Sequence, residues 1–363
     1  MKKIKFLAVA LAAFTMFSCT NDEVENLGNN VPGEQAVLTI KLKGDGDNQA
    51  QSRVAGPATD TEDAVINNYL VFLFREGGAL DCAPHYSASN ATATISNGTT
   101  AAKKAYVVAN TGALANGPFA TVKTEADLLA VEGSLMDNTN NASTQTKTNL
   151  WMSGAEDVTF NGTTGTTTVT LSYVAAKIQL IVKDNRTGMS GGTIQIEDKE
   201  VVLLFAGQSG KFFGTQKSVQ THFYTGDKSY NTPFDTNVTI STALSDAVTV
   251  PFAPNAGNTV FNHFYTFGND GTTQPTILAI KSTKTVNSAA STIYYPVHFT
   301  TADAGHTIEP GKSYTVTVTL NGDVEAGAGG GTIDPEAPVI SSSIEVTVTA
   351  AQWVTQPVDK EFN

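Results

Sequence analysis

Two short segments, one near each end of the chain, share an alternation of apolar and polar residues. The first is 36–43 (AVLTIKLK), whose apolar positions include Leu38, Ile40 and Leu42. The second is 343–349 (SIEVTVT), whose apolar positions are Ile344, Val346 and Val348. A period of two places successive side chains on opposite faces of a strand. Both segments are therefore predicted to be β-strands with one buried face.

Short apolar runs separated by turn residues recur between these two segments. Segment 66–74 (INNYLVFLF) is apolar on both faces towards its end, which predicts a central, covered strand. The other predicted strands are 105–109, 175–183, 200–205, 248–252, 264–267, 276–280, 293–299 and 313–320, with a hairpin formed by 158–160 and 166–172. Short strands with frequent turn signals favour β-sandwiches over βαβ units.

The clearest helical pattern covers 124–135. Thr124 and Asp127 have the spacing of a capping box, in which each side chain bonds the backbone N–H of the other residue. Leu128, Leu129 and Val131 supply an apolar stripe. We therefore expect one helix over 124–135 in a chain that is otherwise all-β.

Composition agrees with this pattern and argues against one class of partner. A length of 363 residues suggests about two domains, and a hydrophobic content of 40% is enough for packed cores. Charged residues make up only 15%, so polar surface must come largely from Thr, Ser, Asn and Gly, and Thr suits a half-buried pleated surface. The net charge of −12 repels phosphate backbones, so nucleic acid is not expected as a partner.

The N-terminus is typical of an export signal. Lysines at positions 2, 3 and 5 accompany an apolar run that ends at Phe17 and is too short to span a bilayer. The junction Ser18–Cys19 resembles a bacterial lipobox, which implies cleavage before Cys19 and acylation of its thiol. An ordinary signal peptide with a chance cysteine is the alternative. If Cys19 carries lipid, Cys82 is the only other cysteine, and no intramolecular disulfide can form.

A polar, glycine-containing loop follows the first alternating segment. Between Lys43 and Arg75 the only basic residue is Arg53. A trypsin-like protease would therefore cut this loop once, between Arg53 and Val54. The cut would separate the first alternating strand from the rest of the chain.

The sequence predicts no enzyme activity, no cofactor and no metal site. Segment 207–211 (GQSGK) resembles a nucleophile elbow only superficially, because Lys211 occupies the position of the last glycine. The five histidines are scattered, and His298 lies in an apolar strand where a packing role is expected. Asp45 and Asp47 stop short of a calcium-loop pattern.

Loss of the first strand would expose a groove with unpaired backbone groups, a hazard that sheets normally avoid. The second alternating strand follows a glycine-rich segment, 327–331 (GAGGG), and could fill the groove of another copy by β-augmentation. Burying its three aliphatic side chains is worth about 5–9 kcal/mol. A head-to-tail contact of this kind can propagate as a fibre.

Several segments resemble one protein family in their order and spacing. They are the lipobox end at Cys19, 65–74 (VINNYLVFLF), 106–112 (YVVANTG), 152–154 (MSG), 174–178 (VAAKI), 308–320 (IEPGKSYTVTVTL) and 346–353 (VTVTAAQW). On these segments the chain resembles the Bacteroidales fimbrillins, the subunits of type V pili. Tyr173 stands where an arginine is expected before the VAAKI strand, which puts only a local contact in doubt.

The resemblance implies two β-sandwich domains of the transthyretin-like, Greek-key type. The expected divisions are a signal peptide (1–18), a lipidated propeptide with a removable first strand (19–53), an N-terminal domain (54–173), a C-terminal domain (174–325), and a glycine linker with a donor strand (326–363). The residues implied are Leu38, Ile40 and Leu42 in the displaced strand, and Ile344, Val346, Val348 and Trp353 in the donor strand.

The resemblance also implies how the protein is anchored, processed and assembled. The precursor would be lipid-anchored in the cell outer membrane and cut after Arg53 by an arginine-specific protease. Its partners would be other copies of itself and accessory fimbrial subunits. The product would be an extracellular fimbrium that supports adhesion and biofilm formation.

Two other interpretations remain open. The first is an accessory, anchor or tip subunit of the fimbrium. Tips need no free donor strand and anchors need no cleavage loop, whereas this chain has both patterns, which favours a structural shaft subunit. A surface glycan-binding lipoprotein would need an exposed aromatic platform. Trp151 and Trp353 are the only tryptophans, and both are expected at family-like core positions.

Overall fold

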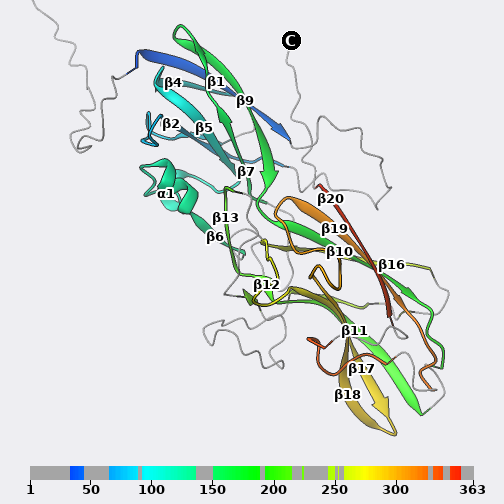
Figure 1. The fold of residues 1–363 in the computed structure, drawn as a ribbon. Helices are drawn as coiled ribbons and strands as arrows, with labels where there is room; N and C mark the ends of the chain where they lie inside the picture. The colour runs from blue at the N-terminus through cyan, green and yellow to red at the C-terminus, as the bar shows by residue number, and fades with distance from the viewer. Residues whose placement is uncertain are drawn as a thin grey trace, which may run out of the picture. The chain divides into compact units, whose positions relative to one another are not determined.

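The fold was obtained as a computed structural model, which describes residues 33–44, 65–88, 92–135, 150–188, 193–214, 223–224, 244–249, 252, 257–325, 330–337 and 344–352. Within these ranges β-strands dominate, with one short α-helix and one 3-10 turn, η1 (Leu114–Asn116). The predicted all-β class is confirmed (Figure 1). The predictions for the signal peptide, Cys19, Arg53, Val54 and Trp353 lie outside the described residues.

The strands of the first half form one sheet that folds over a shared core. They are β1 (Gln35–Gly44), β2 (Tyr69–Arg75), β3 (His85–Ser87), β4 (Ala93–Thr99), β5 (Ala102–Ala109), β7 (Met152–Asp157), β8 (Phe160–Asn161) and β9 (Thr164–Tyr173). Their order is β3-β2-β5-β7-β9-β1-β4, with β8 beside β9. One buried cluster joins side chains of β1, β4 and β9 to side chains of β2 and β5. The two ends of the sheet therefore pack against each other as a sandwich.

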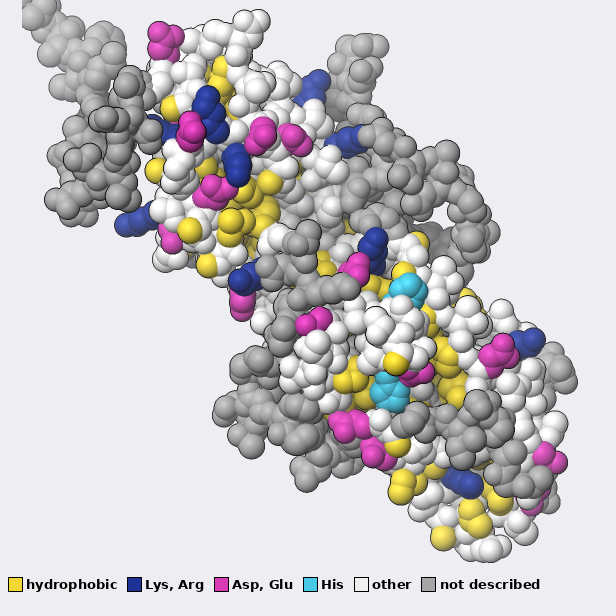
Figure 2. All heavy atoms as spheres, viewed as in Figure 1, with side chains coloured by type: hydrophobic (Ala, Val, Ile, Leu, Met, Phe, Trp, Pro, Cys, Tyr) yellow, Lys and Arg dark blue, Asp and Glu magenta, His cyan; other side chains and the backbone are white. Residues whose placement is uncertain are grey.

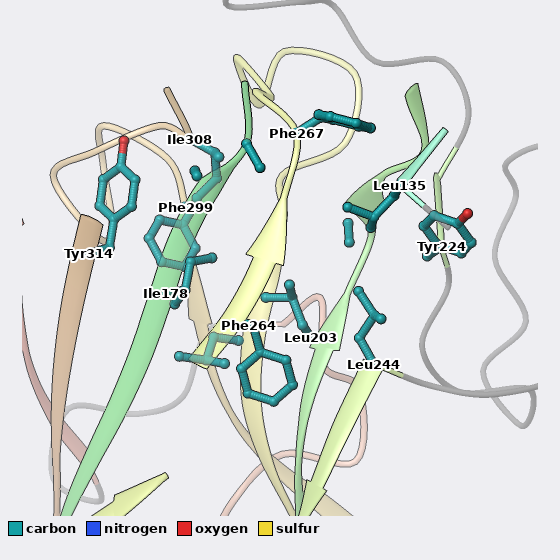
Figure 3. Packing of buried hydrophobic residues seen from close by; sticks show 14 of the residues in the cluster. Leu135, Ile178, Leu203, Tyr224, Leu244, Phe264, Phe267, Phe299, Ile308 and Tyr314 are labelled. Carbon is teal, nitrogen blue, oxygen red and sulfur yellow. The ribbon is translucent and has the colours of Figure 1, made fainter. Parts of the chain in front are cut away.

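The second half contains two four-stranded sheets. Their strands are β10 (Ala176–Asp184), β11 (Ile194–Leu204), β15 (Leu244–Ala247), β16 (Thr259–Thr266), β17 (Ile277–Val286), β18 (Ala289–His298), β19 (Lys312–Leu320) and β20 (Ile344–Gln352). The sheet orders are β16-β10-β19-β20 and β15-β11-β17-β18. Figure 3 shows side chains of both sheets, among them Ile178, Leu203 and Phe264, within the same buried cluster. The predicted β-sandwich class holds here as well.

The helix prediction was right at its start and wrong at its end. Thr124 and Asp127 form the capping box, and α1 covers Glu125–Ala130. The chain then leaves the helix and forms β6 (Glu132–Ser134), which pairs with β13 (Ser209–Lys211). Trp151 packs so closely against Gly133 that a Cβ there would lie 2.1 Å from the indole ring. Contacts distant in sequence therefore overrode the local helical pattern.

Other predictions need smaller corrections. The strand expected over 248–252 is displaced, because β15 ends at Ala247 and residues 248, 249 and 252 are not in a strand. Strands β3, β4, β6, β7, β12 (Ala206–Gly207) and β14 (Phe223–Tyr224) were not predicted. They are short, or they contain many polar residues, so their apolar period is weak.

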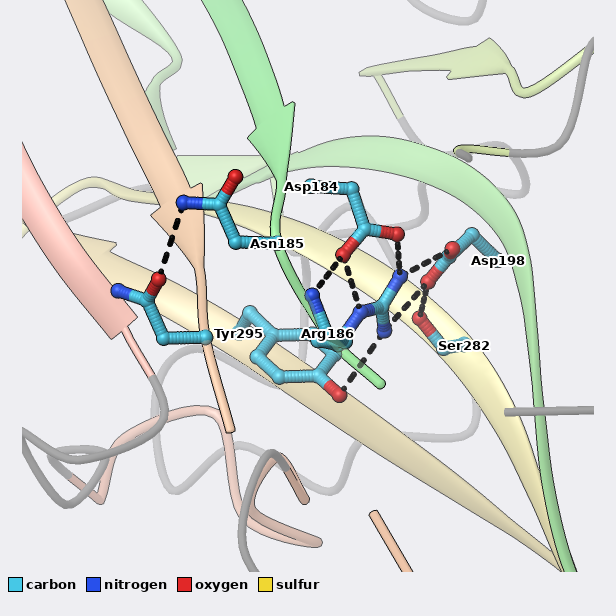
Figure 4. Close-up of polar contacts among 7 residues, drawn as sticks. Asp184, Asn185, Arg186, Asp198, Ser282 and Tyr295 are labelled. Carbon is cyan, nitrogen blue, oxygen red and sulfur yellow. Dashed lines mark hydrogen bonds and ion pairs between the residues drawn. The ribbon is translucent and has the colours of Figure 1, made fainter. Parts of the chain in front are cut away.

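A buried ion cluster fixes the end of β10 in the second half (Figure 4). The Arg186 side chain is fully buried and contacts Asp184 at 2.9 Å and Asp198 at 2.7 Å. Its guanidinium also donates to Tyr295 Oη at 3.2 Å. Burial opposes the charge, but hydrogen bonds with both carboxylates outweigh burial and raise the pKa of Arg186. Each buried charge therefore has a partner, as a buried ion cluster requires.

Candidate strand-exchange site

The first alternating segment is β1, and it lies between two other strands. It runs parallel to β9, from Val37 opposite Thr164 to Gly44 opposite Leu171, and antiparallel to β4. Leu38 and Ile40 are 1% and 0% exposed, and Leu42 packs against the same core from a half-buried position. Removal of β1 would therefore open a groove with β9 and β4 as its walls.

Three further hydrogen bonds hold the start of β1 and the residue before it. The Val37 N–H donates to Thr163 O at 2.8 Å, and the Thr100 N–H donates to Glu34 O at 2.9 Å. The side chain of Gln35 donates to Ser96 O at 3.1 Å. These contacts join β1 to residues on either side of the groove, so β1 is an integral part of the sandwich.

The second alternating segment is β20, and it pairs with its own neighbour in the same chain. It runs antiparallel to β19 over its full length, from Ile344 opposite Leu320 to Gln352 opposite Lys312. Among the described strands it forms the edge of its sheet. Ile344 is 9% exposed, whereas Val346 and Val348 are only half-buried. The predicted alternation is present, with Glu345 and Thr347 exposed.

A short strap, residues 330–337, precedes β20 and is fastened to the second sandwich. Thr332 exchanges backbone hydrogen bonds with Tyr294 of β18, and the Gln274 side chain donates to Glu336 at 3.1 Å. The buried His298 ring lies between two acceptors, Pro335 O at 3.0 Å and the Asp303 carboxylate at 2.9 Å. The expected packing role of His298 is thereby confirmed, and it extends to holding the strap.

Among the described residues, no group of His, Cys, Asp and Glu side chains could hold a metal ion. Cys82 is a free thiol, and burial, reinforced by the nearby Asp81 charge, raises its pKa to about 11.

No helix in the described ranges is long and apolar enough to cross a membrane. Figure 2 shows acidic and basic side chains interspersed on the face that it presents.

Sequence reasoning found both alternating strands and, as 166–172, the wall strand β9, but it missed the other wall, β4, and the pairing of β1 with β9. Ala93 and Ile95 of β4 are buried and alternate with exposed Thr94 and Ser96, which is the signal that could have identified this strand. The parallel pairing of β1 with β9 has no local signal, because it joins segments more than a hundred residues apart in the sequence.

Two family models match the chain. The model for the "Major fimbrial subunit protein (FimA)" matches residues 36–200. The model for the "FimA-like major fimbrial subunit protein, C-terminal domain" matches residues 175–353. Among curated proteins, no relative matches.

Two solved structures of candidate cell adhesion proteins are similar to this chain over most of its length. A crystal structure of a candidate cell adhesion protein from Bacteroides eggerthii DSM 20697 is 75% identical, with a TM-score of 0.82, and the match covers 92% of this chain and 100% of that one. A candidate cell adhesion protein from Parabacteroides distasonis ATCC 8503 is 17% identical, with a TM-score of 0.58, and the match covers 91% and 99% of the two chains. The second likeness shows a common fold.

The chain belongs to the FimA-like major fimbrial subunit family. Members of this family are structural subunits of surface fimbria, and their partners are other fimbrial subunits. The resemblance to fimbrillins drawn from the sequence is thereby confirmed.

Proposed function

We propose that this protein is a shaft subunit of a type V fimbrium and that it polymerises by strand exchange. Cleavage after Arg53 releases β1 from the first sandwich. The empty groove between β9 and β4 then takes up β20 of a second copy. Each subunit both accepts and donates a strand, so the contact repeats head to tail and builds a fibre.

The observation that carries this proposal is the unequal burial of two strands with the same pattern. Leu38 and Ile40 of β1 are 1% and 0% exposed, whereas Val346 and Val348 of β20 remain half-buried at a sheet edge. In the vacated groove, β20 would have a paired strand on each side and a fully covered apolar face. Full burial of an aliphatic side chain contributes about 1.5–3 kcal/mol, so each half-buried valine has about half of that still to gain.

Proteolysis gives the exchange its direction. In the uncut chain, β1 is tethered to its own groove and competes with any incoming strand at a high local concentration. After the cut, β1 is free to diffuse away, and the groove presents unpaired backbone groups on β9 and β4. An incoming β20 loses its ladder with β19 but gains two ladders in the groove.

The proposal also divides the chain and gives its location. The divisions are the signal (1–18), the propeptide (19–53), the two domains (54–173 and 174–325) and the donor segment (326–363). The end of β9 at Tyr173 and the start of β10 at Ala176 support the boundary between the domains. The precursor is anchored in the outer membrane through lipid on Cys19 until an arginine-specific protease releases it, and the fimbrium then supports adhesion and biofilm formation.

The experiment that tests strand exchange uses the precursor without its signal, residues 20–363. We expect the purified precursor to remain monomeric and to form fibres, seen by electron microscopy, after treatment with an arginine-specific protease. N-terminal sequencing of the fibres should find Val54 first. Fibres from the uncut precursor, or fibres that retain 36–43, would contradict the proposal.

Lipidation has a separate test. Cys19→Ala should abolish incorporation of labelled palmitate and keep the precursor from the cell surface, whereas Cys82→Ala should leave labelling unchanged. Normal labelling of the Cys19→Ala protein would exclude acylation at this position without affecting the strand-exchange proposal.

A further inference from the structure

Departure of β1 creates a structural problem for β4. Among the described residues, β4 has its backbone ladder with β1 alone and stands at the end of the sheet order. Two other bonds, Gln35 Nε2 to Ser96 O and Thr100 N–H to Glu34 O, also involve residues that leave with β1. Ala93 and Ile95 still pack in the buried cluster that includes β2 and β5. The end of β4 also needs a polar link if it is to stay in register as the second wall of the groove.

Asp81 provides a link to β4 that does not involve β1. Its side chain is fully buried and accepts hydrogen bonds from the Thr99 N–H at 2.6 Å and from Thr99 Oγ1 at 2.6 Å. Arg75 Nε donates to the same carboxylate at 2.8 Å. Hydrogen bonds to an ionised, buried carboxylate are among the stronger ones in proteins.

The backbone of Asp81 is itself fixed to the opposite layer of the sandwich. The Asp81 N–H donates to Leu73 O of β2 at 2.8 Å. Gly98 of β4 approaches the same place, since a Cβ there would lie 3.3 Å from Leu73 Cδ1 and 3.5 Å from Asp81 Oδ2. Residues 65–99 all follow Arg53 in the sequence, so these contacts survive the proposed cleavage.

We propose that Asp81 is a positioning residue for strand uptake. Through Thr99 it holds the end of β4 against β2 after β1 has left, and it thereby preserves the second wall of the acceptor groove. This inference rests on the proposed exchange of β1 for β20. It assigns a role in the exchange to Asp81, whose carboxylate bonds Thr99 of β4 and Arg75 of β2.

The test compares two variants at Thr99. Thr99→Val keeps the shape but removes the hydroxyl donor, whereas Thr99→Ser keeps the donor and serves as the matched control. Each precursor (20–363) is cut with an arginine-specific protease and separated from its released β1 segment. Binding of an excess of fluorescent peptide 340–363 is then measured. We expect Thr99→Val to weaken binding by at least about tenfold, because it removes the hydrogen bond to the Asp81 carboxylate and the bond that Thr99 Oγ1 accepts from the Ala101 N–H. Thr99→Ser keeps both bonds and should stay within about twofold of wild type.

Hydrogen exchange separates this inference from the proposal on which it rests. In the cut wild-type chain, the Thr99 amide should stay protected, and in Thr99→Val it should exchange at least about tenfold faster, although the uncut precursors behave alike. If cut wild type keeps this protection but binds no peptide, strand exchange is wrong and the role in uptake falls with it, whereas the Asp81 link itself stands. If protection at Thr99 is lost in cut wild type, or if Thr99→Val binds peptide like wild type, the positioning role is overturned.

A second variant covers the case in which Thr99→Val fails to fold as a precursor. Asp81→Asn keeps an acceptor for the Thr99 N–H but removes the charge, and the Arg75 side chain it leaves is 25% exposed and can be hydrated. The same peptide titration should show weaker binding for Asp81→Asn than for wild type. Equal binding would overturn the proposal.

Discussion

β1 and β20 have the same period-two pattern, but they occupy different environments. β1 is paired on both edges, and its Leu38 and Ile40 are 1% and 0% exposed. β20 is paired with β19 on one edge and leaves Val346 and Val348 half-buried. The alternation therefore specifies which face of a strand turns inward. The surroundings of the strand decide how completely that face is buried.

The two strands also differ in how they join the rest of the chain. β1 continues into 45–64, the segment that contains Arg53. β20 follows the strap 330–337, which Tyr294, Gln274 and His298 hold against the second sandwich. A single proteolytic cut would therefore free β1, whereas β20 would remain attached to its own subunit. This difference assigns the leaving role to β1 and the donating role to β20 in the proposed exchange.

The largest expected effect comes from keeping β1 attached. Arg53→Ala should abolish fibres completely, because the tethered β1 competes with any donor for its own groove. Electron microscopy of cells that produce the variant would show this, with a full-length surface lipoprotein in place of the mature chain. Arg53→Lys keeps the positive charge and should behave like Arg53→Ala if the protease is specific for arginine. Normal fibres from Arg53→Ala would remove β1 from the mechanism.

The next effect tests the two faces of β20. Val346→Asp should prevent fibre formation, because burial of an unpaired carboxylate in the groove costs more than about 3 kcal/mol. Its neighbour Glu345 points outward and is exposed, so Glu345→Lys should polymerise normally. As uncut precursors, both variants should be folded by circular dichroism. Normal fibres from Val346→Asp, or loss of fibres only in Glu345→Lys, would refute the proposed orientation of β20.

A moderate effect compares the burial of the two strands directly. Ile40→Ala should lower the free energy of unfolding of the precursor by about 3 kcal/mol, because it leaves a cavity in a closed core. Val348→Ala should cost only about 1 kcal/mol, since this side chain is half-buried at an edge. Urea denaturation of residues 20–363 measures both. Equal losses would show that the two strands are equally well covered.

The smallest effect concerns the support of the strap. Burial opposes ionisation of Asp303, but hydrogen bonds from the His298 ring and backbone outweigh it and lower the pKa of Asp303. A lowered pKa means that Asp303 stabilises the fold above its unfolded pKa of about 3.9 and that this contribution is lost as the pH falls through the folded value. Because the Asp303 side chain is partly exposed, Asp303→Asn should cost less than about 1 kcal/mol at neutral pH.

Thermal unfolding of wild type and Asp303→Asn between about pH 3 and pH 7 checks the sign of this effect. The difference between the two proteins should be constant near neutral pH and should shrink in acid. A difference that grows in acid would contradict the assignment. Glu156→Gln, at an exposed position of β7 in the first sandwich, serves as the control.

Local patterns were sufficient for most long strands and for the start of α1. The runs at 36–43, 175–183, 313–320 and 343–349 are all strands, because their apolar period agrees with the side-chain alternation that a half-buried strand needs. The capping box at Thr124 and Asp127 forms as expected, because it depends only on residues three positions apart.

Predictions failed where distant contacts outweighed local preference. The chain leaves the helical pattern after Ala130, because β6 pairs with β13 and Gly133 lies against Trp151. β4 was not predicted, because its polar residues weaken the apolar period of the segment. Its buried face nevertheless closes the core around β1. The link from Asp81 to Thr99 spans segments whose proximity only the folded chain reveals.

The sequence by itself determined the all-β class, the inward faces of the two alternating strands and the position of Arg53 between the first strand and the rest of the chain. These properties follow from side-chain period and from the order of residues, both of which are local. Only the tertiary structure decided which strands border β1, that β20 lies on β19 at a sheet edge, and that Asp81 holds β4. Those facts depend on pairing between segments far apart in the chain, where backbone hydrogen bonds form without regard to side-chain identity and shared burial of apolar faces selects the partner.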